Sequence, residues 1–292
     1  MIGELLSTTM AAETLQTAVP YVCAGLGGVW SERSGVVNIA LEGMLLAGGL
    51  AGVTAHLATG SAWAGLVSGA AVGGAIGALH ALIVVRGRVD AIVSGLAINL
   101  AAAGGTRVAL RALYGSSSNS PAIAGFPSAV GGSSGGALLL RTLLEPTTLA
   151  AALLVGWTAW TLAATRLGLR VRACGEGAGA AASAGVDVGR VRLVAVSIGG
   201  AIAGLGGVAL AYDQHRFQSG MSGGRGFIAL AAVILAAWRP GRMALACLAF
   251  AALEAAQIVL QQPTGAVAAL APMLPYVATL GVLALVGRRR RR

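Results

Sequence analysis

Four polar side chains, Glu32, Arg33, Asn38 and Glu42, lie between two apolar stretches that are long enough to cross a membrane. A charged side chain at the centre of a membrane helix costs roughly 2.5–3.5 kcal/mol on insertion scales, so such residues indicate a polar pathway or an interrupted helix. Two interpretations remain open. Either Asn38 and Glu42 contact a passing solute, or the charges form internal ion pairs, Glu42 with Arg33 or Glu32 with Arg225.

The amino-acid composition indicates whether these residues belong to a soluble protein or to a membrane protein. Hydrophobic residues make up 57% of the chain and charged residues 10%, and the mean hydropathy is +0.82. A soluble globule does not have this balance. The apolar segments run for about 17–25 residues without the alternation of a membrane strand. The sequence therefore predicts an all-α, polytopic membrane bundle.

Hydropathy divides the chain into about eight to ten membrane segments, which form one transmembrane domain over residues 1–292. The segment at 226–238 is too short to cross alone, so we expect at least one short or broken helix. Because the chain contains 45 Gly, we expect the helices to pack closely through small residues. The expected segments are 11–30, 36–58, 62–85, 89–110, 146–165, 193–212, 226–238, 243–261 and 267–286.

The arginines predict the orientation, because basic residues near the ends of spans remain on the cytoplasmic side. All 20 basic residues are Arg. We expect a cytoplasmic C-terminal tail (287–292), a cytoplasmic loop (166–192) and an external loop (113–145). The N-terminus is outside if 11–30 is a full span, and inside if the Glu32 region is a break within the membrane.

Several kinds of chemistry are not expected. The chain has no Lys, so the phosphate-binding motif G-x-x-x-x-G-K-[ST] does not occur in it. Cys23, Cys174 and Cys247 have no metal-ligand spacing and are expected to be small buried side chains. The three His residues are scattered, so neither a metal site nor an intramembrane enzyme is expected. Nucleic acid is not an expected partner.

The loop at 166–192 contains an Ala-rich stretch, 178–184, between glycines. Gly185 follows this stretch as a C-cap would, so a short helix is expected there. Two interpretations remain open for the loop. It is a docking element for a cytoplasmic partner, or it is a connector that carries positive-inside charges.

Three segments in order resemble one family. They are residues 31–44 (SERSGVVNIALEGM), 170–176 (RVRACGE) with 184–186 (AGV), and 224–234 (GRGFIALAAVI). Together they resemble the permease subunits of bacterial ABC importers for nucleosides and simple sugars, within the ribose and branched-chain amino acid permease superfamily. The resemblance covers about residues 15–262. The chain departs from the family pattern at 177–180 (GAGA) and at 238–240 (WRP).

The resemblance implies a multi-pass subunit in the plasma (inner) membrane of a bacterium. Its implied partners are cytoplasmic ABC ATPase subunits, an external substrate-binding lipoprotein, membrane lipids and a second permease subunit, which by family habit is a paralogue. The ATPase subunits would use ATP, and this chain would carry no cofactor. The residues that match the family's coupling loop are Arg172, Ala173, Cys174, Gly175, Glu176, Ala184 and Gly185.

A nucleoside pathway needs hydrogen-bonding groups for hydroxyls and base edges, and a face on which the base stacks. We hypothesise that Asn38, Glu42, Asn99 and Phe227 supply these groups. Glu32, Arg33 and Arg225 are expected as structural charges at the membrane breaks. The alternative is a stand-alone secondary transporter or channel for a small polar solute, with Asp90, Glu42 and Glu254 as its candidate relay.

Overall fold

The protein is a bundle of α-helices, as expected. The computed structural model describes residues 7–127, 132 and 134–261, and within these ranges it contains helices and no strand. The helices are α2 (Thr8–Arg33), α3 (Leu41–Thr59), α4 (Ala62–Val85), α5 (Ala91–Tyr114), α6 (Gly135–Leu144), α7 (Pro146–Ala164), α8 (Arg166–Glu176), α9 (Ala178–Ser183), α10 (Val188–Asp213), α11 (Arg225–Leu235) and α12 (Pro240–Gln261).

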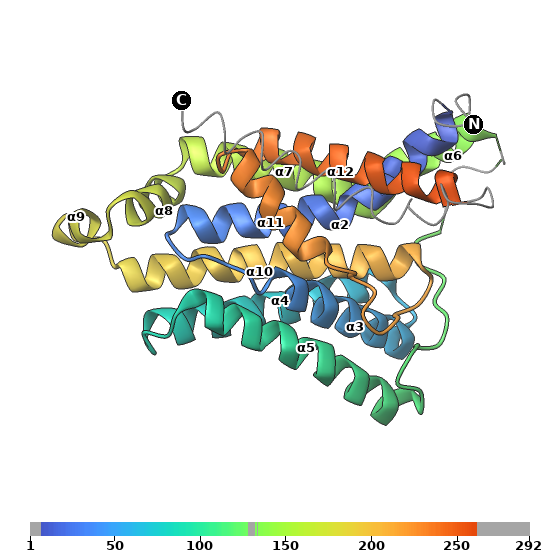
Figure 1. Ribbon diagram of the computed structural model, residues 1–292, viewed down its shortest axis with the longest axis horizontal. Coiled ribbons are helices and arrows are strands. Elements are labelled where there is room, and N and C mark those ends of the chain that lie inside the picture. Colours follow the sequence, from blue (N-terminus) through green and yellow to red (C-terminus); the bar gives the residue numbers. More distant parts are fainter. Residues whose placement is uncertain (1–6, 128–131, 133, 262–292) are drawn as a thin grey trace.

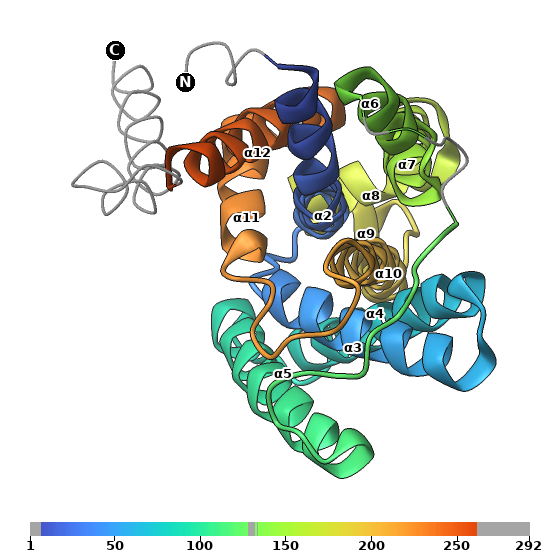
Figure 2. The same ribbon diagram turned by 90° about the vertical axis from the view of Figure 1, so that its right-hand side faces the viewer.

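Two long antiparallel helices, α2 and α10, occupy the centre of the bundle (Figures 1 and 2). Every residue from 18 to 31 in α2 is buried, and a helix that is apolar all round belongs in such a position. The helices α3, α4 and α5 lie on one side of this pair. The helices α11 and α12 cover a second side, and α6, α7 and α8 cover the third (Figure 2).

Glycines let the central helices approach closely. A Cβ built on Gly27 would lie 2.6 Å from the carbonyl oxygen of Gly199, and one built on Gly199 would lie 2.5 Å from the carbonyl oxygen of Gly27. At the contact between α10 and α4, a Cβ on Gly204 would overlap the backbone of Gly69. The small-residue packing expected from the composition is therefore present, and it brings helix backbones into direct contact.

Gly204→Ala is expected to destabilise the protein by about 1–3 kcal/mol, because the added methyl group must push α4 away from α10. Thermal unfolding of the detergent-purified protein measures the effect. Gly156→Ala on α7 is the matched control, since a Cβ there meets no atom within 4 Å. Equal melting temperatures for the two variants would contradict the role of the α4–α10 contact.

Five helices, α3, α4, α5, α7 and α10, are long and apolar enough to cross a membrane. The central helix α2 has 26 residues and is about 39 Å long, which exceeds the hydrocarbon thickness of a bilayer. The helix α11 has only 11 residues and is the short helix that the sequence predicts. The chain is a multi-pass membrane protein. The expected span at 267–286 and the arginine tail at 287–292 lie outside the described residues.

The arginine clusters meet at one end of the bundle. Arg33 lies beside Trp238 and the backbone of Gly175, while Arg86 and Arg190 line one small cavity. We call this the arginine-rich end. The first turn of α2 lies at the opposite end, where Thr8 contacts Gly135 of α6 (Figure 1). Because α2 crosses the whole bundle, the break after Arg33 lies at the arginine-rich end. If that end is cytoplasmic, the N-terminal end of α2 is external.

The described residues of the segment expected as an external loop lie at the end opposite to the arginine-rich end. Residues 116–127 form an extended strap along the turn that follows α10. The backbone N–H of Ser120 donates to the carbonyl of Phe217 at 2.9 Å, and that of Ile123 donates to the carbonyl of His215 at 2.8 Å. The later part of the segment forms α6, a helix that the sequence analysis did not predict.

Candidate functional site

Asn38 fixes the break between α2 and α3. The chain leaves α2 through Gly35, which has a φ of +84°. The Asn38 Oδ1 accepts from the backbone N–H of Ala40 at 3.0 Å, and its Nδ2 donates to Ser31 Oγ at 3.0 Å. The side chain is fully buried. Asn38 therefore ties the end of α2 to the start of α3.

Asn99 reaches the same break from α5. Its Oδ1 accepts from the N–H of Gly43 at 2.8 Å, and its Nδ2 donates to the carbonyl of Ile39 at 2.9 Å. The first N–H groups of a helix have no partner within the helix, so Asn99 caps α3 from outside. His80 of α4 adds a third tie, because its Nε2 lies 3.2 Å from the carbonyl oxygen of Val37.

Glu42 of α3 binds the N-terminus of the short helix α11. Its Oε1 accepts from Ser222 Oγ at 2.5 Å and from the N–H of Gly224 at 2.8 Å, and its Oε2 accepts from the N–H of Gly226 at 2.8 Å. A carboxylate in this position is stabilised by the partial positive charge of the helix N-terminus. The absence of a side chain at Gly226 allows the approach, since a Cβ would lie 2.5 Å from Glu42 N.

Arg225, the first residue of α11, has a separate acidic partner. It forms an ion pair with Glu254 of α12, and the Tyr21 hydroxyl donates to the other oxygen of Glu254 at 2.7 Å. Glu32 instead accepts from the indole N–H of Trp238. Neither of the two ion pairs suggested by the sequence, Glu42–Arg33 or Glu32–Arg225, forms between these described residues.

The fold explains why these two ion pairs do not form. Glu32 and Arg33 end α2 at the arginine-rich end, where the Arg33 Nε donates to the carbonyl of Trp238 at 3.2 Å. The N-terminus of α11 lies deeper in the bundle, at the level of Glu42, so the backbone of α11 neutralises the carboxylate that an arginine was expected to pair with.

The loop at the arginine-rich end consists of two short helices. The helix expected at 178–184 is present as α9, and it ends in a Schellman motif. Gly185 has a φ of +82°, its N–H donates to the carbonyl of Ala182, and the N–H of Val186 donates to that of Ala181. The preceding helix α8 was not predicted. It ends at Glu176.

The end of α8 contacts the α2–α3 break directly. A Cβ on Gly175 would overlap the carbonyl oxygen of Arg33, and the Arg192 Nε donates to the carbonyl of Ser34 at 3.1 Å. The Cys174 thiol is buried at this contact, and burial raises its pKa, although Arg192 opposes the shift. The loop and the break therefore form one packed unit.

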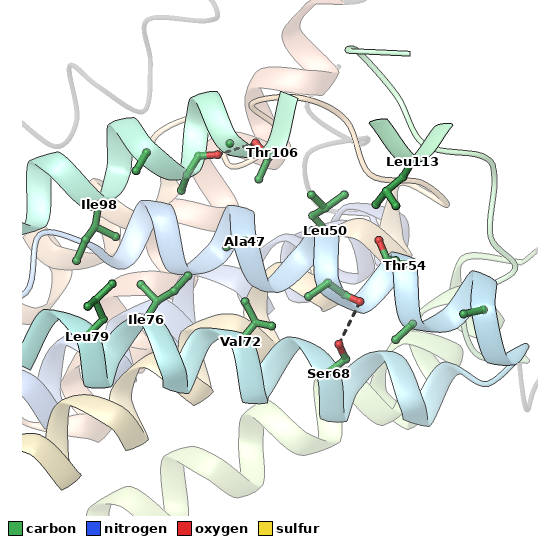
Figure 3. Close-up of a pocket in the computed structure, with 16 residues that line it drawn as sticks. Ala47, Leu50, Thr54, Ser68, Val72, Ile76, Leu79, Ile98, Thr106 and Leu113 are labelled. Carbon is green, nitrogen blue, oxygen red and sulfur yellow. Dashed lines mark hydrogen bonds between the residues drawn. The ribbon is translucent and has the colours of Figure 1, made fainter. Parts of the chain in front are cut away.

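A large cavity in the described part of the bundle lies apart from these polar groups. It has a volume of about 680 Å³ and lies between α3, α4 and α5, whose apolar side chains point into it (Figure 3). Its three hydroxyl side chains take part in hydrogen bonds of the protein itself. Ser68 donates to the carbonyl of Ala51, Thr106 donates to that of Ala102, and Thr54 accepts from Tyr114. Such walls give a polar solute little to bind.

The structure brings three of the four hypothesised pathway residues together. Asn38, Glu42 and Asn99 surround the first turn of α3, where each is bonded to protein groups. Phe227 lies on α11 and is 45% exposed. Their role in a pathway stays a prediction. Sequence reasoning missed the partners Ser222 and Trp238. The Gly/Ser run at 219–224, directly before an apolar helix, was the available signal for the first of these.

A short half-helix whose N-terminus lies inside an apolar bundle, as in α11, is typical of membrane transporters. Sequence comparison assigns the family. The chain belongs to the family described as branched-chain amino acid transport system / permease component, whose model matches residues 10–283. It is therefore a permease component of a transport system.

Three relatives of this chain have names that give different substrates. The chain is 34% identical to a guanosine ABC transporter permease protein of Bacillus subtilis over 258 residues, which cover 82% of this chain and 78% of the relative. It is 31% identical to a nucleoside ABC transporter permease protein of Lactococcus lactis over 94% of this chain and 91% of the relative. It is 32% identical to a glucose ABC transporter permease protein of Haloferax volcanii over 82% of this chain and 67% of the relative.

Proposed function

We propose that this chain is the membrane-spanning permease subunit of an ABC importer for nucleosides or simple sugars. The names of its relatives support this class of substrate. The observation that carries the proposal is the packed path from the loop at the arginine-rich end to the half-helix α11. In this path Gly175 touches the α2–α3 break, and Glu42, close behind the break, holds the N-terminus of α11.

The packed path links a movement of the loop at the cytoplasmic end to the helices in the membrane interior. Cytoplasmic ATPase subunits, the partners that membership of the permease family supports, bind at α8 and α9 and use ATP. A displacement of α8 moves the break at Arg33 and Gly35 with it, since no side chain separates their backbones. The start of α3 follows, and Glu42 transmits the movement to α11.

Membership of the permease family supports the remaining partners of this proposal. An external substrate-binding lipoprotein delivers the solute at the end opposite to the arginine-rich end, and a second permease, a paralogue, completes the pathway. The assembly resides in the plasma (inner) membrane of a bacterium, with its arginine-rich end in the cytoplasm. Asn38, Glu42, Asn99 and Phe227 remain our candidate pathway residues.

Gly175→Ala tests the path. The added methyl group must displace α8 from the carbonyl of Arg33, and we expect the uptake of radiolabelled guanosine or glucose by the complete importer to fall about tenfold, since such overpacking costs about 1–3 kcal/mol. The matched control is Gly179→Ala on the neighbouring helix α9, where a Cβ meets no atom within 4 Å.

The two variants must be compared at equal levels in the membrane, with the ATPase activity of the purified importer measured alongside uptake. We expect Gly175→Ala to retain ATP hydrolysis and to lose the uptake that depends on it. Full uptake by Gly175→Ala would show that transport does not depend on this packed path. Transport without any ATPase subunit would support the alternative, a stand-alone secondary transporter.

The structure gives the three acids of that alternative separate structural partners. Asp90 accepts from the N–H groups of Ile92 and Val93 and caps α5. Glu42 caps α11, and Glu254 pairs with Arg225. We therefore favour the importer over an ion-driven transporter.

A further inference from the structure

A second cavity, of about 320 Å³, opens at the end opposite to the arginine-rich end. Three regions that are distant in the sequence converge on it: α2, the stretch that runs from the strap through α6 to the start of α7, and the end of α10. We call it the outer pocket. It is lined by Gln16, Ala124, Gly125, Phe126, Pro127, Leu138, Arg141, Thr142, Leu144, Glu145, Pro146, Tyr212, Asp213 and His215.

The outer pocket differs in chemistry from the apolar cavity between α3, α4 and α5. The carboxylates of Glu145 and Asp213 are hydrogen-bond acceptors, the guanidinium of Arg141 is a donor, and the amide of Gln16 is both. A hydroxyl group also donates and accepts. A ligand with several adjacent hydroxyls therefore matches a wall that offers carboxylate, amide and guanidinium groups together.

One wall of the outer pocket is a packed aromatic cluster. Phe126 and Tyr212 meet edge to face with ring centroids 5.6 Å apart, and Trp63 packs against Phe126 from behind at 5.0 Å. Tyr212 is only 2% exposed, and its hydroxyl donates to the carbonyl of Ala62 at 2.8 Å. This wall is fixed before a ligand arrives, and it supplies the apolar face that sugar rings and bases need.

The outer pocket is also linked to the half-helix α11. Asp213 lies within electrostatic range of Arg225 and Glu254, the ion pair at the start of α11. Asp213 thus belongs to the outer pocket and also interacts electrostatically with the ion pair at the start of α11.

We propose that the outer pocket is a binding site for a polyhydroxylated solute, namely the ribose diol of a nucleoside or the hydroxyls of a simple sugar. The carboxylates of Glu145 and Asp213 accept from adjacent hydroxyls, and Phe126, backed by the buried ring of Tyr212, contacts the apolar face. This inference rests on the proposed function, since it assigns the solute of the importer to a particular place in this subunit.

The test uses the purified importer in nanodiscs without the external binding protein. Calorimetry measures the binding of guanosine, of 2′,3′-dideoxyguanosine, which lacks the diol, and of glucose. We expect saturable binding of guanosine or of glucose, and which of the two binds identifies the source of the hydroxyls. Dideoxyguanosine is expected to bind about tenfold more weakly than guanosine or not at all, because the carboxylates lose their donors.

Glu145→Gln and Asp213→Asn, which preserve size, are each expected to weaken binding about tenfold, since hydrogen bonds to charged groups are the stronger ones. Arg111→Gln is the control, because Arg111 is exposed near the same end of the bundle and does not line the outer pocket. Thermal unfolding establishes that each variant is folded.

Unchanged binding in both carboxylate variants would overturn the proposal, and so would equally tight, saturable binding of guanosine and dideoxyguanosine. Uptake by the same importer in cells separates this outcome from failure of the proposed function. If guanosine or glucose enters the cells while the folded importer binds neither without the binding protein, the outer pocket is not a solute site and the proposed function stands. If no nucleoside or simple sugar from a panel that includes both solutes enters the cells, the proposed function itself falls.

Discussion

Glu42→Ala is expected to lower uptake of the transported solute by about tenfold or more. The carboxylate accepts three hydrogen bonds, from Ser222 Oγ and the N–H groups of Gly224 and Gly226. Hydrogen bonds to charged groups contribute about 1.5–3 kcal/mol each, and a buried donor that loses its acceptor is costly. Without Glu42 the N-terminus of α11 has no anchor on α3, so movement of the break no longer reaches α11.

The measurement is uptake at matched membrane levels for a small set of variants. Glu42→Gln retains an acceptor oxygen and is expected to lose less than Glu42→Ala. Ser222→Ala removes one partner, and the double variant is expected to lose less than the sum of the two single losses, because the pair acts as a unit. Normal uptake by Glu42→Ala would show that α11 is held by other contacts.

The same variants separate the two roles that the sequence leaves open for Glu42. If Glu42 only positions α11, uptake of every accepted solute falls by the same factor. If the carboxylate contacts the solute, the loss differs between nucleosides that carry different hydroxyls, because the site loses a specific partner. Asn38→Ala provides the comparison, since the Asn38 amide is bonded within the break.

Hydropathy alone predicts most of the helices. The spans expected at 62–85 and 146–165 are almost the observed α4 and α7, and the short segment at 226–238 is α11. These predictions succeed because burial in lipid requires long apolar helices, a property that is local in the sequence. The C-cap at Gly185 is also local, since it needs only a glycine after the last turn.

The hydrogen-bond partners of the polar side chains are not local in the sequence, and for this reason the sequence did not predict them. Glu42 bonds to residues about 180 positions later in the chain, and no spacing rule links such distant residues. The helix α8 was missed for another reason. Its buried residues Val171 and Cys174 lie three positions apart, as on a helix face, but the surrounding arginines and glycines give the segment the composition of a loop.

Arg225→Ala is expected to destabilise the protein by about 3–5 kcal/mol, because it leaves the carboxylate of Glu254 in a mostly buried environment without its cation. The two side chains are only 17% and 18% exposed. Glu254→Ala is expected to be similarly harmful, since Arg225 then loses its charge partner. The measurement is the melting temperature and the monodisperse fraction of the detergent-purified protein.

The double variant Arg225→Met with Glu254→Leu is the most stringent test of this prediction. Replacing a buried ion pair by apolar residues of similar volume is often neutral or stabilising, whereas removing one member is costly. The double variant should therefore be more stable than either single variant. Uptake by the double variant separates folding from function. If the pair only holds α12 against α11, uptake recovers with stability. If the charges also serve transport, the double variant folds but remains inactive. A double variant no more stable than the single ones would contradict the pairing.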